Sequence, residues 1–399
     1  MTQRSISQTR TTIPNSSGEL AGGRRRHADS PPLPDDMLAE ILLLLPPVPI
    51  HLFRAAFVSK RWRGLVHDAR FLRRFREFYG GTPPILGFFN NHPRSPLFIP
   101  TSGGFAASTA AKMSHDNWWA LHCRHGHALL QNRRTGTVLV WDLVTGDRRH
   151  LPLPSRAQEW SSNGAALCAA GHADHGGCRS CPFLVAYVFS RERNAVTSAC
   201  TYSSETGVWS ELTSIVLPFA SVAVKPTALV GNTLYCLLDN YNILEFDLVN
   251  HRLGLTQKFP RNALCSYEDH IVIMPTEDGH LGLAGVEGLN LHLWSLMASV
   301  DGLVTWTHQR VIDLENFLAP EVVAATCNFW VEPIGFAEDA GVIFIYVHPR
   351  VYMIHLKSMQ IEEVPEKGNY SSILPYTSFY APGITTGGGD DQAELLNNC

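Results

Sequence analysis

The stretch VLVWDLVTGD, residues 138–147, decides the fold class of this 399-residue chain. Its first half has the length and β-branched content of a strand. Asp142, Thr145 and Gly146 then form a polar turn in which glycine supplies a positive φ. Four later segments end a short strand on a polar residue in the same way, at Ser203, Asp247, Ser295 and His355. These anchors recur roughly every 44 to 61 residues, close to the period of about 40–50 residues of β-propeller blades.

The chain from residue 84 onward has the pattern of β-structure throughout. Apolar runs of about four to eight residues are bounded by Gly, Asn, Asp and Pro. The sequence has neither the spaced leucines and asparagines of a leucine-rich solenoid nor the long helices of a doubly wound α/β fold. The predicted fold class is therefore multi-domain, first α and then all-β: a small helical domain followed by a β-propeller of degenerate repeats.

Residues 33–80 have a helical period instead. Pro34 suits a first helical turn, where its missing N–H has no partner, and Asp35 and Asp36 face the positive end of the helix dipole. Pro46 and the proline after it end this helix. Aliphatic residues spaced i, i+3, i+4 and i+7 predict one apolar stripe along it: Leu38, Ile41, Leu42 and Leu45. Three more short helices are expected, carrying Leu52, Ala55 and Ala56, then Trp62, Leu65 and Val66, then Phe71, Phe75 and Phe78.

The two ends of the chain are poor in large apolar side chains. Such segments cannot offset the entropy cost of ordering, which predicts a disordered N-terminal tail and a flexible C-terminal tail. The expected organisation is therefore a tail over 1–30, a helical domain over 31–80, a β-propeller over 84–382 and a tail over 383–399.

Charge and cysteine content make several classes of binding partner unexpected and indicate the cellular compartment. Asp and Glu number 36 against 32 Lys and Arg, so no broad positive field for a nucleic acid is expected. The most apolar run, 41–45, meets prolines far short of a membrane span, so we expect no membrane partner. Nine cysteines and a polar N-terminus without a signal peptide predict a reducing, intracellular place, in the cytoplasm, the nucleus or both.

The helical region resembles the F-box in an ordered set of motifs: LPDD (33–36), EIL (40–42), LP (45–46) and VSKRWR (58–63). The region after it resembles the kelch-like, F-box-associated β-propeller of plant F-box proteins: PILGFF (84–89), HGHALL (125–130), VWD (140–142), TGDRR (145–149), LPLP (151–154) and PYTSFY (375–380). The resemblance covers residues 33 to about 382.

This resemblance implies a function without catalysis. In that family the F-box docks on a Skp-type adaptor, which joins it to a cullin and a RING subunit. The C-terminal domain captures a protein target for ubiquitination. A module of about 45 residues cannot hide all of its apolar surface, which agrees with a docking role. The residues that the resemblance assigns to adaptor binding are Leu33, Pro34, Ile41, Leu42, Leu45, Val58 and Trp62.

Two departures from the family pattern are Leu44, where a basic residue is common, and Ser59, where cysteine is common. Neither is expected to abolish docking, and Leu44 enlarges the apolar patch. The target-binding residues are not assigned by any motif. Weak candidates are aromatic residues in less regular connections, Trp118, Trp119 and Trp160, since exposed aromatics anchor interfaces.

Other chemistry is less well supported by the residues. The run from His172 to Cys181 holds four zinc-ligand types, but the two pairs are too close together for a usual structural site, so we interpret it as an enlarged loop. No metal and no cofactor are predicted. A second group is interpreted as half-exposed strand residues: His122, Cys123, His125 and His127.

Two alternatives to the receptor function stay open. One is a scaffold or binding module that degrades nothing. The other, less favoured, is a propeller glycan hydrolase, for which paired carboxylates are available: Asp142, Glu245, Asp247 and Asp301. Because Asp142 and Asp247 recur at the same place in their repeats, they are better explained as residues that form turns by accepting backbone N–H groups.

Overall fold

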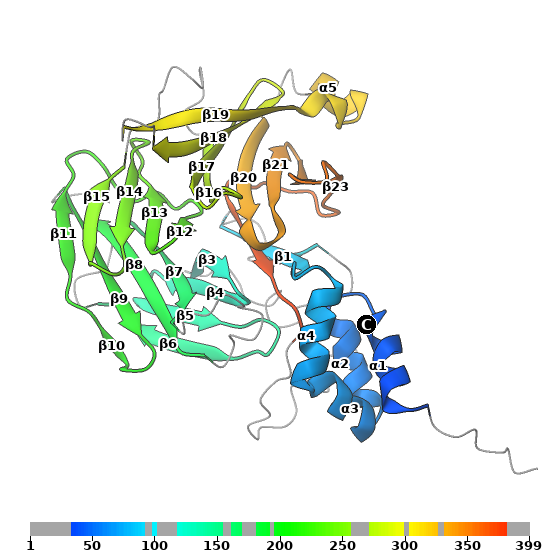
Figure 1. Ribbon diagram of the computed structural model, residues 1–399. Coiled ribbons are helices and arrows are strands. Elements are labelled where there is room, and N and C mark those ends of the chain that lie inside the picture. The colour runs from blue at the N-terminus through cyan, green and yellow to red at the C-terminus, as the bar shows by residue number, and fades with distance from the viewer. Residues whose placement is uncertain are drawn as a thin grey trace, which may run out of the picture.

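The computed structural model describes residues 33–91, 98–101, 118–154, 161–169, 181–191, 195–256, 271–298, 303–325 and 331–380. Four helices at the N-terminus are followed by strands in six sheets that surround one axis, a six-bladed β-propeller (Figure 1). None of the helices in these ranges combines the length and the apolar character needed to cross a lipid bilayer.

The four expected helices are α1 (Asp35–Leu43), α2 (Pro49–Val58), α3 (Lys60–His67) and α4 (Ala69–Phe78). Pro34 caps α1, and the helix ends before the expected prolines. Side-chain oxygens of Ser59 and Asp68 accept backbone N–H groups at the starts of α3 and α4, which fixes the two tight corners between helices. The core of this helical module is formed by Leu38, Leu42, Leu43, Leu52, Ala55, Ala56, Val66, Phe71 and Phe75.

One predicted feature of the helical module is wrong. Ile41 does not share the buried stripe of α1, since its side chain is 47% exposed, whereas Leu43 is buried in its place. The last aromatic residue of α4, Phe78, is exposed too, at 56%. A short helix in a small module needs only a narrow buried stripe, so side chains at its margins stay in solvent.

Five of the six sheets are built from consecutive strands paired antiparallel. They are β3–β6 (Trp118–Arg124, His127–Asn132, Thr137–Trp141, Arg148–Pro152), β7–β11 (Ser161–Cys168, Phe183–Arg191, Val196–Ser203, Val208–Trp209, Thr213–Val216), β12–β15 (Ala228–Val230, Thr233–Leu237, Ile243–Asp247, Arg252–Leu255), β16–β19 (Ile271–Pro275, Leu281–Glu287, Asn290–Ala298, Val304–Asp313) and β20–β23 (Val331–Ala337, Val342–Val347, Arg350–His355, Ile361–Glu363). Three short helices are η4 (Leu314–Asn316), α5 (Pro320–Ala325) and η6 (Glu338–Ala340).

The five predicted anchors all lie in or at the end of the third strand of their sheet. Asp142 accepts the backbone N–H groups of Val144 and Thr145 at 2.9 and 3.1 Å, and Gly146 closes the turn with φ of 77°. Asp247 accepts two backbone N–H groups in its own turn in the same way. The prediction that these aspartates form turns is therefore confirmed.

The sixth sheet joins the two ends of the propeller. Its order is β2 (Phe98–Pro100), β1 (Ile85–Asn90) and β24 (Ile373–Thr377), so that the last strand pairs antiparallel with the first. In Figure 1 the red β24 lies against the cyan β1. This arrangement closes the ring, because the strand that completes the last blade is also bonded to the start of the propeller.

Six apolar clusters occupy the six spaces between neighbouring blades. Trp141 is buried between the sixth sheet and β3–β6, beside Phe89, Phe98 and Tyr376, and Trp294 packs between β12–β15 and β16–β19. Both tryptophans therefore fill space between neighbouring blades. Tyr376 strengthens the closure, since its hydroxyl donates to the Gly126 carbonyl at 2.7 Å.

The chain returns to the helical module after β24. Phe379 and Tyr380 are buried in the same cluster as the core of the helices, and the Tyr380 hydroxyl lies 3.0 Å from Nε2 of His67. From the other side, Val48 of the α1–α2 connection packs against the cluster between the first and last blades. The helical module is therefore attached to the propeller at both ends of the propeller's chain.

Candidate functional site

A row of exposed aliphatic side chains follows one side of α1. Met37, Ile41 and Leu44 are spaced by four and three residues on α1 and its C-cap, which places them on one helical face, and Leu33 lies in the segment that enters the helix. Their exposed fractions range from 47% to 70%. In the view of Figure 1, α1 lies on the outer side of the helical module, away from the blades. We call these four residues the α1 row; it is an apolar surface that nothing else in the described chain covers.

Sequence reasoning had named only part of this surface. Leu33, Pro34 and Ile41 are exposed as a docking residue must be, and so is Val58 at the end of α2, at 61%. Met37 was missed, although its spacing from Leu33 and Ile41 could have revealed it. The apolar residues of the buried stripe dominate the sequence pattern of this helix, so the four-residue spacing of the outer face was not recognised.

Leu42 needs a correction. Its side chain is 1% exposed and packs inside the helical core, so it cannot contact an adaptor directly in this conformation. Leu45 and Trp62 are half-buried against the same core, which leaves part of each side chain accessible. The physical reason is the three- and four-residue periodicity of α1, which turns Leu38 and Leu42 inward and Met37 and Ile41 outward.

Arg61 fixes the start of the α1 row. Its Nε lies 2.6 Å from Oδ1 of Asp35, and its Nη2 donates to the carbonyl oxygen of Leu33. Both groups belong to the segment that enters α1, whereas Arg61 stands on α3. The pair is exposed, so its effect on the free energy of folding is small, but it holds Leu33 and Pro34 in one position.

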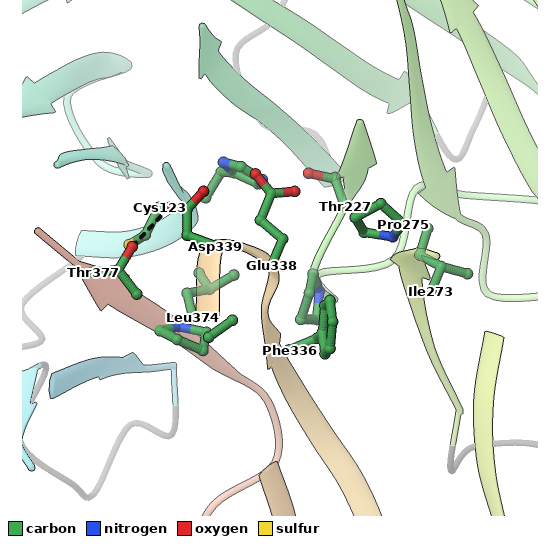
Figure 2. Close-up of a pocket in the computed structure, with 13 residues that line it drawn as sticks. Cys123, Thr227, Ile273, Pro275, Phe336, Glu338, Asp339, Leu374 and Thr377 are labelled. Atoms are coloured by element: carbon green, nitrogen blue, oxygen red, sulfur yellow. Dashed lines mark hydrogen bonds between the residues drawn. The ribbon is translucent and has the colours of Figure 1, made fainter. Parts of the chain in front are cut away.

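A small cavity opens at one end of the propeller axis, close to β24. It is lined by inner strands of several blades and by η6, with a volume of about 30 Å³, roughly the space of a few water molecules. Figure 2 shows that the side chains of Glu338, Asp339 and Thr227 converge on it. Thr377 of β24 donates a hydrogen bond to Oδ2 of Asp339 at 2.9 Å, which links this cavity to the closing strand.

The charged groups of this axial cavity are largely withdrawn from solvent. Glu338 lies 2.8 Å from Nε of Arg124, and both side chains are less than one fifth exposed. Burial raises the pKa of Glu338 to about 7, against the opposite effect of Arg124. Burial, with a smaller effect of Arg124, lowers the pKa of His122 to about 3, so this imidazole is neutral at physiological pH.

The histidine group named from the sequence is therefore split by the structure. His122 is buried at the cavity, whereas His125 occupies the β3–β4 hairpin turn with a φ of 48°. Burial raises the pKa of the Cys123 thiol well above its ordinary value, which disfavours the reactive thiolate form. Glu338 and Asp339 were not found from the sequence, because the turn that carries them matches no repeat position.

The aromatic candidates for target binding are only partly accessible. Trp118 packs against the cluster between the first and last blades, and the guanidinium of Arg133 lies 4.0 Å above the ring of Trp119. Trp160 lies outside the described residues. Their role in target binding stays a prediction.

Of the residues considered for enzyme or zinc chemistry, the described aspartates Asp142 and Asp247 lie apart. Asp142 and Asp247 are held in separate turns of different blades, and Asp301 lies outside the described residues. In the run from His172 to Cys181, only Cys181 is among the described residues.

Two family models match the chain. The model described as "F-box domain" matches residues 31–74, and the model described as "F-box protein AT5G49610-like, beta-propeller" matches residues 119–383. The second match alone covers more than half of the chain. No significant match to a curated protein is found.

Solved structures show only distant likeness. A protein of unknown function from Bacteroides caccae is 11% identical, with a TM-score of 0.38 over 70% of this chain and 89% of that one. The WD40 domain of SCAP from fission yeast is 12% identical, with a TM-score of 0.36 over 65% and 56%. A protein of unknown function from Bacteroides thetaiotaomicron is 13% identical, with a TM-score of 0.34 over 67% and 62%. The chain thus spans less than two thirds of the last two, and no functional conclusion follows from TM-scores this low.

Proposed function

This chain belongs to the family of F-box proteins with an AT5G49610-like β-propeller, and from that premise we propose that it is the substrate receptor of a Skp–cullin–F-box ubiquitin ligase. The helical module docks on a Skp-type adaptor, and the propeller loops capture a protein target. The chain itself performs no covalent chemistry. Its place is intracellular, in the cytoplasm, the nucleus or both.

The observation that carries this proposal is the α1 row. An F-box has too little chain to bury all of its apolar residues, and here four of the large aliphatic side chains that stay exposed follow one another along α1. A contiguous aliphatic strip on a helix suits a partner that offers an apolar groove. Arg61 adds preorganisation, because Leu33 and Pro34 are already held in place before the partner arrives.

The mechanism is proximity. A receptor of this kind raises the concentration of a target lysine near the ubiquitin-carrying enzyme, so the separation and orientation of its two binding surfaces matter. The double attachment of the helical module supports a fixed geometry: the α4–β1 connection through Gly80 and Gly81 is accompanied by the buried contacts of Phe379 and Tyr380. Lengthening the Gly80–Gly81 junction alone would therefore leave a second connection in place.

The test is co-purification with a Skp-type adaptor and a cullin. The variant Ile41→Asp with Leu44→Asp is compared with a control, Val216→Asp with Val249→Asp, which places the same charges on exposed aliphatic positions of the propeller. Capture of both partners by the native chain and the control, with loss in the α1-row variant, is the expected result. Capture of the adaptor without cullin would favour a non-degradative scaffold, and capture of neither would refute the receptor function.

A further inference from the structure

The axial cavity contains buried polar atoms that have no hydrogen bond to the part of the chain that the structure describes. His122 is 6% exposed and its Nδ1 has no hydrogen-bond partner within the described residues, and the same holds for Oγ1 of Thr227, which is 7% exposed. Both side chains line the cavity. Burying an unsatisfied polar group opposes folding, and such groups are normally satisfied by water, an ion or a ligand.

Three metal-ligand side chains meet beside these atoms. His125, Glu338 and Asp339 each place one potential ligand atom within 4.8 Å of the other two. Two ligand atoms that share a metal ion at 2.0–2.2 Å can be as far apart as about 4.4 Å, so small side-chain rotations would bring all three to bonding distance. His125 comes from the β3–β4 hairpin and the two carboxylates from η6, so the group joins two different blades.

The size of the cavity limits what can occupy it. A volume of about 30 Å³ suits an ion or a few water molecules and is far smaller than the sites that hold a sugar or a nucleotide. The charged groups at the cavity also favour a cation, because two carboxylates face a single guanidinium, that of Arg124. Nε of Arg124 lies 2.8 Å from Glu338 and donates to Nε2 of His125 at 3.3 Å, so this guanidinium has to turn aside when an ion binds. Asp339, in contrast, keeps one oxygen beyond its bond to Thr377.

We propose that the axial cavity binds one divalent transition-metal ion of the zinc type, with His125, Glu338 and Asp339 as ligands and His122 as an additional nitrogen donor on the cavity wall. Mixed imidazole and carboxylate donors suit zinc, whereas calcium and magnesium take oxygen donors. The ion lies where the β3–β4 hairpin, η6 and the closing strand β24 meet, so it fastens the first, fifth and sixth blades at one end of the axis.

The experiment uses Co²⁺ as a spectroscopic probe. The full chain is treated with a chelator and titrated with Co²⁺, the visible absorption of bound cobalt is recorded, and Zn²⁺ is then added in competition. One equivalent of bound Co²⁺ that Zn²⁺ displaces is the expected result. Glu338→Gln and Asp339→Asn, which keep the side-chain shape, are each expected to weaken binding about tenfold or more.

Two matched controls separate this site from other ligands in the chain. One is Cys178→Ser with Cys181→Ser, which removes the thiols of the His172–Cys181 run. The other is His292→Ala with His308→Ala, an exposed pair whose ring nitrogens lie 3.2 Å apart. Both controls are expected to bind like the native chain. Three results would overturn the proposal: no cobalt band, loss of binding in either control, or unchanged binding in both Glu338→Gln and Asp339→Asn. The melting temperatures of all variants are compared as well, because equal values show that a loss of binding comes from the site and not from unfolding.

Discussion

The helical module and the propeller solve the problem of burying apolar side chains in opposite ways. The propeller buries its apolar side chains almost entirely between its own blades, since each blade covers its neighbour and six clusters fill the spaces between them. The helical module is incomplete twice: its core accepts Phe379 and Tyr380 from the far end of the chain, and its outer face leaves the α1 row exposed. A module with so little chain depends on other segments on the inside and on a partner on the outside.

The largest expected effect on stability comes from removing the two aromatic side chains that the C-terminal segment contributes to the helical core. Phe379→Ala with Tyr380→Ala deletes two buried aromatic side chains, and each buried Phe→Ala change costs about 3–5 kcal/mol. We expect hydrogen exchange across α1–α4 to rise strongly while the blades stay protected. This readout does not depend on adaptor binding.

Phe219→Ala is the matched control for that pair, because Phe219 is 97% exposed and its removal leaves no cavity. Unchanged exchange in α1–α4 of the double variant would mean that the helical module is complete without the C-terminal segment.

The closure of the propeller provides the next test. Tyr376→Phe removes a hydroxyl that donates to the Gly126 carbonyl and accepts the Leu143 backbone N–H at 3.1 Å. Buried groups are then left unsatisfied, at a cost of about 1–3 kcal/mol, so the propeller is expected to melt several degrees lower. Tyr202→Phe is the control, since its hydroxyl has no hydrogen bond within the described residues. Equal melting of the two variants would contradict the role of Tyr376 as a fastening between the first and last blades.

A smaller effect is expected at the entry to the α1 row. Arg61→Ala releases Leu33 and Asp35, which should weaken adaptor binding a few-fold and hardly change the melting temperature, because exposed pairs contribute about 0–1 kcal/mol. Arg74→Ala breaks a comparable exposed pair with Glu40 at 2.7 Å and should leave binding as it is. Calorimetry with the purified adaptor measures both, and equal affinities would remove the preorganisation argument.

The smallest expected effect is a pH dependence confined to the helical module. Burial, with the nearby Arg63 as a lesser cause, lowers the pKa of His67, whose ring also meets the Tyr380 hydroxyl. A lowered pKa means that protonation opposes folding, so this contribution is present above the unfolded value of about 6.5 and is lost as the pH falls below it. Unfolding of α1–α4 between pH 7.5 and 5.5 should depend less on pH in His67→Gln, and an unchanged slope would contradict this.

The parts of the fold that repeat could be predicted from the sequence. A strand that ends on a polar turn residue is a local pattern, which is why Asp142 and Asp247 pointed to the third strand of their blades. The sixth blade could not be found in this way, because β24 and β1 lie at opposite ends of the propeller chain and pair only after the ring closes.

The candidate sites were less accessible to sequence reasoning. For the α1 row, the motif pointed to a segment with exposed aliphatic side chains, but it included the buried Leu42, since one-dimensional spacing does not say which of two adjacent stripes faces inward. The axial cavity combines His122 with Glu338, more than two hundred residues away, and no local pattern relates them. Sites made by closing a ring depend on tertiary contacts alone.

The burial of Phe379 and Tyr380 in the helical module has a consequence for synthesis on the ribosome. The four helices are made first, yet two of their core side chains follow only after the strand that closes the last blade. A chain that stops early therefore lacks both a closed propeller and a finished helical core, so that a truncated chain is not left with an intact helical module. Under the proposed function, recruitment of the ligase is in this way tied to completion of the propeller.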